Sequence, residues 1–176
     1  MRVVTVRGLT LEPQFASHAA AMFDVLSDPV IYEYENEPPA SVVALRRRFT
    51  RLESRRSPDG AQQWLNWVIR LHTGDLAGYV QATVHPDGRA ALAYVLASRH
   101  WGKGIAARSV HAMIGELRER HGVGECFAIL KAANFRSGRL LQRLGFVPAA
   151  PGAASVEVEP DEILMTLPAT ATPSTR

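Results

Sequence analysis

Gly102 and Gly104 are separated by a single residue, and this spacing suggests a chemical role. They lie between an apolar run typical of a strand and a run typical of a helix. Glycine reaches positive φ and leaves space for a ligand beside the main chain. The first amides of a helix lack partners within it, and the helix dipole adds about half a positive charge there. With Arg99 and Lys103 nearby, we expect an anion site, most naturally for a pyrophosphate; a turn that merely uses glycine is the alternative.

The segment GKGIAA also matches the G-x-G-x-x-A pattern of dinucleotide-binding folds. That pattern should follow the first strand of a βαβ unit, and an acidic residue should end the next strand about 20 residues on. Here three strands that look antiparallel precede the turn, and the next strand, ECFAIL, ends at Lys131. The pattern G-x-x-x-x-G-K-[ST] of phosphate-binding loops does not occur. Both nucleotide-binding classes are therefore poor interpretations.

Hydrophobic periodicity predicts the elements that must position this turn. Apolar runs that alternate or are continuous predict strands, and apolar residues at i, i+3, i+4 and i+7 predict helices. We expect strands over residues 3–13 (kinked at Gly8), 62–71, 76–85, 89–97, 125–130 and 162–168, and helices over 15–26, 42–52, 104–121 and 134–144. Ser41 and Gly145 suit the start and the end of two of these helices. This order predicts an α+β fold, a mixed α/β layer.

Composition narrows the class of protein. The 176 residues carry a formal net charge of +3, too small to indicate nucleic-acid binding. The single cysteine, Cys126, cannot form an internal disulfide and is expected to be a small buried hydrophobe in a reducing cytoplasm. No apolar run approaches the roughly 20 residues of a membrane span, and the N-terminus lacks the features of a signal peptide. The six histidines show no metal-ligand spacing, so we expect a cytoplasmic protein with no metal, membrane or nucleic-acid partner.

The segment RHWGKGIA resembles the R/Q-x-x-G-x-G/A signature of the GNAT superfamily of acyl-CoA N-acyltransferases, with Arg99, Gly102 and Gly104 in the signature places. AANFRSGRLLQRLGFV is similar to the Asn-containing helix that follows in that superfamily, with Asn134, Ser137 and the closing LGF. LAGYVQ resembles the strand that precedes its bulged strand. The LSDPVIYEY connector and the Trp before the first glycine are most similar to the branch that includes the ribosomal-protein N-terminal alanine acetyltransferases.

The resemblance implies a fold and a domain. We expect a central, mostly antiparallel sheet of about seven strands flanked by about four helices, with a V-shaped opening between the fourth and fifth strands. Residues 1–168 would form a single acyltransferase domain, and residues 169–176 a disordered tail with nothing to bury. A homodimer is common among similar proteins and stays open here.

The resemblance also implies that acetyl-CoA, or another acyl-CoA, binds in the V-shaped opening as cosubstrate. The pyrophosphate would contact the amides of the glycine turn, the pantetheine arm would pair with the strand at Leu96 and Ala97, and Asn134 would contact that arm. Ser137 would lie near the thiol or the arm. The turn residues expected to bind the cosubstrate are Arg99, Gly102, Lys103, Gly104, Ile105 and Ala106.

Structural roles are open for several of these residues. Asn134 could N-cap its helix, with or without a ligand contact. Ser137 could bond only to nearby backbone. For Trp101 we favour a core aromatic packed under the turn. The arginines over residues 46–56 are expected to form a solvated helix face, with binding of an acidic partner as the alternative.

Acyl transfer to an amine needs a neutral amine, donors for the oxyanion and a thiolate that can leave. We expect a backbone amide near Leu96 or Ala97, freed by a bulge, to polarise the thioester carbonyl. Many family members carry a Tyr at the position of Leu141, so Ser137, Tyr94 or a water must protonate the thiolate, or it leaves unassisted. The base is expected in the acidic connector, which carries Glu33, Glu35 and Glu37. Glu33 is placed first because two tyrosines flank it; a solvated acidic loop is the alternative.

These observations predict an N-acyltransferase, acetyl in the first instance, that acts on a primary amine by direct transfer in a ternary complex. The acceptor, a protein N-terminus or a small molecule, cannot be inferred from the sequence. A non-catalytic CoA-binding regulatory module is the alternative, because the usual Tyr is missing. Nucleic-acid binding rests only on the arginines.

Overall fold

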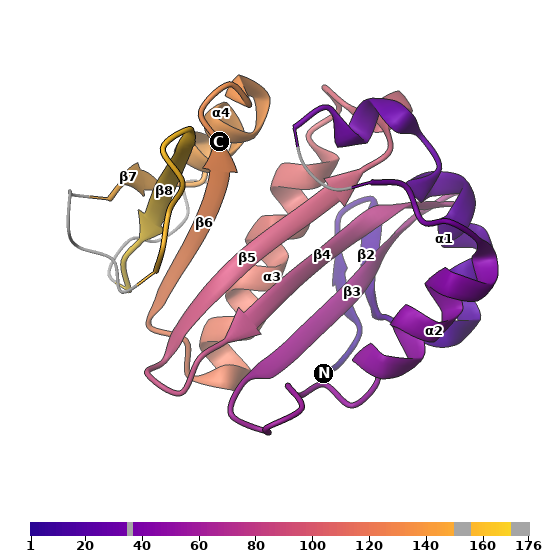
Figure 1. Cartoon of the computed structure of the whole chain (residues 1–176), viewed down its shortest axis with the longest axis horizontal. Helices are drawn as coiled ribbons and strands as arrows, with labels where there is room; N and C mark the ends of the chain where they lie inside the picture. Colours follow the sequence, from indigo (N-terminus) through magenta and orange to yellow (C-terminus); the bar gives the residue numbers. More distant parts are fainter. Residues whose placement is uncertain (35–36, 150–155, 170–176) are drawn as a thin grey trace.

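A sheet forms the centre of the computed structural model (Figure 1), which describes residues 1–34, 37–149 and 156–169. Within these residues it has eight strands in the order β1-β2-β3-β4-β5-β6-β8-β7. Every neighbouring pair is antiparallel except β5–β6, which is parallel. The strands are β1 Val4–Val6, β2 Leu9–Pro13, β3 Gln63–Leu71, β4 Leu76–Val84, β5 Arg89–Leu96, β6 Glu125–Lys131, β7 Val147–Pro148 and β8 Glu162–Leu167.

Four α-helices flank the sheet in the described part of the chain (Figure 1). They are α1 Ala19–Leu26, α2 Val42–Leu52, α3 Ile105–His121 and α4 Phe135–Arg143. α1 and α2 pack together on one face of the sheet, where Met22, Leu45 and Phe49 belong to one buried cluster with Val68 of β3. α3 belongs to the larger cluster on the other face. The expected mixed α+β architecture is therefore confirmed.

Ser41 and Gly145 mark the start of one helix and the end of another, where expected. The Ser41 side chain accepts a hydrogen bond from the Ala44 amide at 3.1 Å at the start of α2. Gly122 ends α3 in the left-handed region at φ 65°. Gly145, with φ +90°, follows the last turn of α4. No helix among the described residues is long and apolar enough to cross a membrane.

The first strand differs from its expected form. Residues 3–13 do not make one strand kinked at Gly8, because β1 and β2 pair as an antiparallel hairpin with Val4 opposite Leu11 and Val6 opposite Leu9. Gly8, with φ +84°, sits in the tight turn between them. A left-handed glycine serves a hairpin turn better than a kink, because it reverses the chain at once. This hairpin, together with the short β7, brings the strand count to eight rather than seven.

The one parallel pair opens the sheet. β5 and β6 pair only where Arg89, Ala90 and Ala91 face Glu125, Cys126 and Phe127. Beyond Ala91 the two strands diverge, and β6 continues along β8 as far as Lys131 opposite Glu162 (Figure 1). The expected V-shaped opening therefore lies between the strands labelled β5 and β6. The last residues of β5, the glycine turn after it and α4 all meet at its wide end.

Candidate active site

Two adjoining cavities lie at the open end of the V. The first, called the turn cavity here, is lined by the end of β5, the start of α3 and the start of α4, including Leu96, Trp101 and Ala106. The second, called the α2 cavity, extends over the sheet face beneath α2 and includes Arg48, Tyr79 and Gln81. The two cavities share part of their walls: Ile31, Tyr34, Tyr94, Val95, Asn134 and Ser137.

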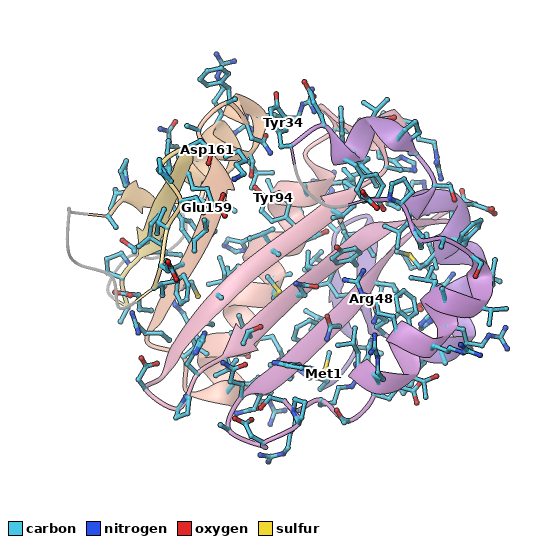
Figure 2. The ribbon with its side chains drawn as sticks, viewed as in Figure 1. Met1, Tyr34, Arg48, Tyr94, Glu159 and Asp161 are labelled. Carbon is cyan, nitrogen blue, oxygen red and sulfur yellow. The ribbon has the colours of Figure 1, made fainter. Side chains whose placement is uncertain are left out.

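A hydroxyl pair stands where the cavities meet. The Tyr94 Oη of β5 and the Ser137 Oγ of α4 are 2.6 Å apart, and either can be the donor. Figure 2 shows Tyr94 in the opening between β5 and β6, with Tyr34 above it. Burial raises the pKa of Tyr94 to about 12, although the hydrogen bond to Ser137 works against this rise. Tyr94 therefore keeps its proton at neutral pH and can donate it.

The glycine turn has the geometry of an anion site. A 3₁₀ turn over Ser98–His100 follows β5, and Gly102 and Gly104 then adopt φ values of 74° and 69°. A Cβ at Gly102 would meet nothing within 4 Å, so the backbone conformation, and not crowding, calls for glycine. The first hydrogen bond of α3 runs from the Arg108 amide to the Gly104 carbonyl at 3.1 Å. The preceding amides of the first turn are thus left without partners inside the helix.

The cationic side chains of the turn are arranged around its backbone. The Lys103 Nζ donates to the carbonyl of Arg99 at 2.9 Å, which folds the lysine over the turn. The Arg108 guanidinium approaches the Lys103 carbonyl at 3.5 Å. Positive side chains and free helix amides thus coincide, which favours a phosphate group at this place.

The indole of Trp101 supports the turn from below. Its Nε1 donates to the Leu96 carbonyl at 2.8 Å, and the ring packs against the large core cluster. Trp101 thus packs against the core under the turn, as expected, but it is only partly buried and also lines the turn cavity. The Arg136 guanidinium lies 3.6 Å from the centre of the indole ring. This contact links α4 to the turn across the mouth of the cavity.

The sequence did not point to Asp28, which ties the connector between α1 and α2 to the glycine turn. Its carboxylate accepts from the Ser98 amide at 3.0 Å and from the Val30 amide at 3.1 Å. Hydrogen bonding from Ser98 lowers the pKa of this carboxyl. An Asp before Pro29 is a recognisable helix-start signal, and Asp28 does N-cap the short 3₁₀ turn Pro29–Tyr32. The contact with Ser98 leaves no trace in local sequence.

A model of the acetyltransferase (GNAT) domain matches residues 8–147 of the chain. This protein belongs to the GNAT acetyltransferase family. A curated relative, an uncharacterised N-acetyltransferase p20 of Bacillus licheniformis, is 25% identical over 148 residues, which is 83% of each chain.

Solved structures share the fold of this GNAT domain. The ribosomal-protein-S5-alanine acetyltransferase of Vibrio fischeri superposes with a TM-score of 0.78 and 17% identity, over 96% of this chain and 97% of that one. The spermidine N-acetyltransferase of Vibrio cholerae, in complex with CoA and spermine, gives a TM-score of 0.76 and 17% identity, over 94% and 98%. The first of these belongs to the branch that the sequence resembles.

The GNAT domain places its three candidate catalytic residues on one cavity. Glu33, Tyr94 and Ser137 all line the turn cavity. Tyr32 lines the α2 cavity and Tyr34 lines both, so the two tyrosines flanking Glu33 do form walls. The Tyr32 hydroxyl is held by a hydrogen bond to the Leu26 carbonyl at 2.8 Å.

The rest of the acidic connector is divided between the cavities. Glu37 lines the α2 cavity, whereas Glu33 lines the turn cavity. Glu35 lies outside the described residues. Burial raises the pKa of Tyr34, and the nearby Glu33 carboxylate adds to this rise.

Among the residues expected to bind the cosubstrate, Leu96, Ala106, Asn134 and Ser137 line the turn cavity. The Asn134 Oδ1 accepts from the Ser137 amide at 3.1 Å, so its predicted N-cap role is confirmed. Its place in the walls of both cavities keeps a ligand contact as a prediction. Leu141 is buried and lines the α2 cavity, so a hydrocarbon side chain stands where many family members carry a tyrosine.

The expected free amide at Ala97 is wrong. The Ala97 amide donates to the Ala77 carbonyl at 2.9 Å, and Ala97 is fully buried. No bulge interrupts β5, since its register with β4 is continuous from Val84 opposite Ala90 to Gly78 opposite Leu96. The register shift lies instead between β3 and β4.

Strand alternation identifies the amides that do face the V. Backbone N–H groups alternate in direction along a strand. Because the Ala97 amide points to β4, those of Leu96 and Tyr94 point to the opposite edge, where β6 has already diverged. Leu96 therefore stays a candidate donor to a bound carbonyl, without a bulge.

The only cysteine of the chain is a structural residue. Cys126 is buried at the start of β6, and burial raises the pKa of its thiol to about 11. A neutral, enclosed thiol is a poor nucleophile. Within the described ranges, no group of three His, Cys, Asp or Glu side chains could hold a metal ion.

Proposed function

We propose that this protein transfers an acyl group, acetyl in the first instance, from acyl-CoA to a primary amine by direct transfer in a ternary complex. The observation that carries the proposal is the pair of adjoining cavities that meet at Tyr94 and Ser137. One reaches the glycine turn and suits the donor, and the other reaches the sheet face under α2 and suits the acceptor. Two substrates held side by side need no covalent enzyme intermediate.

The donor half of the proposal rests on the glycine turn. The pyrophosphate of CoA would lie on the first amides of α3, near Lys103 and Arg99, and the pantetheine arm would follow the open edge of β5 toward Tyr94. The Leu96 carbonyl already accepts from Trp101, so the arm would share this carbonyl or pair with the amide beside it. The family membership and the CoA complex of the Vibrio cholerae enzyme support CoA as the donor.

The chemistry then follows from the residues at the junction. The neutral amine attacks the thioester carbon, the C–N bond forms, and the Leu96 amide donates to the oxyanion. Collapse of this intermediate breaks the C–S bond, and Tyr94 gives its proton to the leaving thiolate. Glu33, directly or through water, takes the proton that the amine loses. Ser137 holds the Tyr94 hydroxyl in place at 2.6 Å.

A thermal-shift assay tests the donor site. CoA at about 100 times its dissociation constant should stabilise the protein by roughly 2.7 kcal/mol. Gly104→Ala should abolish this shift, because a Cβ on the turn displaces the phosphate. Gly60→Ala is the matched control: Gly60 has φ 73°, close to the 69° of Gly104, and lies in a distant turn. Both variants carry similar backbone strain, but only the first should lose the shift; no shift in the wild type would contradict the proposal.

Release of free thiol from acetyl-CoA, measured with a panel of amines and N-terminal peptides, tests the transfer itself. Turnover with any amine supports the enzyme. A CoA-dependent thermal shift without thiol release on any acceptor would instead favour the non-catalytic CoA-binding module, which the buried Leu141 suggests.

A further inference from the structure

The α2 cavity is lined by charges of both signs. Glu37 stands on the connector before α2, and Arg48 is presented by α2 itself. Figure 2 shows Arg48 beside α2, on the same side of the sheet as that helix. Among residues 1–34, 37–149 and 156–169, neither side chain has a hydrogen-bond or ion-pair partner. An anion and a cation that have no partner among these described residues make the cavity complementary to a molecule that carries both charges.

We propose that the acceptor is a zwitterion: its amine lies beside Tyr94, where the two cavities meet, and Arg48 binds a carboxylate of the same molecule. This inference rests on the proposed acyltransferase function and specifies its acceptor class. Guanidinium binds carboxylate through two parallel N–H donors, which fixes orientation as well as charge. Arg48 is therefore a specificity-determining residue, and the carboxylates of the connector draw in the amine.

Packing of α2 explains why Arg48, and not its neighbours, has this role. Leu45 and Phe49 anchor the helix in the core with exposed fractions of 1% and 2%. Arg48 lies one turn from Leu45, at the flank of this buried face, and its charge acts on Tyr32 in the cavity wall. Arg46, Arg47 and Arg48 are all exposed, but of the three only Arg48 lines these cavities. The arginine-rich helix thus presents one of its cations to the acceptor.

The surface beyond Arg48 has room for a longer acceptor. Arg48 and Gln81 also line a third cavity, which continues along β3 and β4 to Trp64 and Asn66. This wall is held in place, since the Trp64 Nε1 donates to Gln62 and the Asn66 amide donates to the Trp64 carbonyl at 3.2 Å. The carboxylate can therefore belong to a free amino acid or to an acidic side chain near a peptide N-terminus.

Matched acceptor pairs test the inference. One arm compares free amino acids with the amines left by their decarboxylation (alanine with ethylamine, phenylalanine with phenethylamine). The other compares the C-terminal amides of Ala-Asp and Ala-Asn. In each pair the reacting amine is kept and only the carboxylate is lost. A hydrogen bond to a charged partner strengthens binding affinity by about 10- to 100-fold. We therefore expect kcat/KM to favour the carboxylate member by that factor in at least one arm.

Variants of α2 assign this preference to one side chain. Arg48→Gln should bring the ratio within each pair close to one, and Arg48→Glu should reverse it. Arg47→Gln, which removes an exposed arginine of the same helix, should leave the ratio unchanged. The wild-type ratio should also shrink in high salt, because Arg48 is exposed and salt screens its charge. A wild-type ratio near one, or a ratio that survives in Arg48→Gln, would overturn the inference while leaving the acyltransferase intact.

A binding measurement separates this inference from the chemistry. With saturating CoA present, the carboxylate member of a pair should raise the melting temperature of the wild type but not of Arg48→Gln. Equal shifts for both members would overturn the zwitterion even if no acceptor is acetylated. If no pair gives thiol release but the melting temperature still rises only with the carboxylate member, the proposed transfer would be contradicted. The proposed carboxylate-binding role of Arg48 would then stand.

Discussion

At the scale of single residues, we propose that Tyr94, held by Ser137, acts in place of the tyrosine that Leu141 replaces. The two side chains are 43 positions apart in the chain, yet their oxygens are 2.6 Å apart. A phenol with a pKa of about 12 keeps its proton well above neutral pH, and a thiolate forming beside it can accept that proton. Burial keeps this phenol protonated to higher pH than an exposed phenol, and it also makes the phenol a weaker acid.

Tyr94→Phe should lower kcat by roughly 100-fold, because it removes a general acid but keeps the ring that lines both cavities. CoA affinity, measured by the thermal shift, should stay close to that of the wild type. Ser137→Ala should lower kcat less, since this hydroxyl only holds the phenol. The double variant should be no slower than Tyr94→Phe, because the two groups act as one unit. If kcat of Tyr94→Phe stays within twofold of the wild type, the thiolate leaves unassisted or is protonated by water.

At the scale of elements, Gly78 lets β5 approach β4 closely at the mouth of the V. A Cβ built at Gly78 would lie 2.0 Å from the Val95 carbonyl oxygen and 2.9 Å from the Leu96 Cα. Both obstacles are backbone atoms, which cannot turn aside as a side chain can. The same stretch of β5 presents Leu96 to the turn cavity. The position of the donor-binding edge therefore depends on a missing side chain in the neighbouring strand.

Gly78→Ala should destabilise the protein by about 1–3 kcal/mol or more and weaken CoA binding, because the end of β5 must move. Chemical denaturation and the CoA thermal shift measure the two effects. Gly115→Ala is the control: Gly115 is inside α3, has an ordinary φ, and a Cβ there would meet nothing within 4 Å. That substitution should stabilise by roughly 0.5–1 kcal/mol. A neutral Gly78→Ala would show that the strands separate freely.

At the scale of the whole molecule, burial and hydrogen bonding shift several pKa values in one direction. Burial lowers the pKa of His18, His100 and His121 below the usual 6.5. Ion pairing with Arg70 lowers the pKa of Glu12, and hydrogen bonding from Ser98 lowers that of Asp28. In each case the unfolded chain binds protons more readily than the folded one. Acid therefore favours the unfolded state.

The melting temperature should consequently fall as the pH is lowered. The contribution of the three histidines is present above their unfolded pKa of 6.5 and is lost as the pH falls through their lower folded values. The carboxylates Glu12 and Asp28 add a second loss below their ordinary values of 4.5 and 3.8. Thermal melts between pH 8 and pH 3 measure both steps. Replacing the three histidines by glutamine should flatten the first step, and a melting temperature that rises from pH 7 to pH 5 would contradict the assignment.

The sequence by itself determined the donor side of this protein. The order of strands and helices, the glycine turn before α3 and the Asn-capped start of α4 follow from periodicity, capping and φ preferences. These depend on residues within a few positions of one another. The family resemblance used the same short segments, and the domain match over residues 8–147 confirmed it. Gly8 shows the limit of such signals, because a left-handed glycine fits both a kink and a hairpin.

Only the tertiary structure decided which side chains line the proposed acceptor site. The Tyr94 hydroxyl contacts Ser137, and the Asp28 carboxylate accepts from the Ser98 amide, 70 positions along the chain. Arg48 lines the cavity over the sheet face beneath α2. The amide at Ala97 is taken by β4, which the motif alone could not show. These contacts depend on strand order and on where β5 and β6 part, because chain segments far apart in sequence meet only once the sheet has formed. Local spacing therefore indicates the proposed donor site, which is formed by backbone groups. The assembled sheet sets the side chains of the proposed acceptor site.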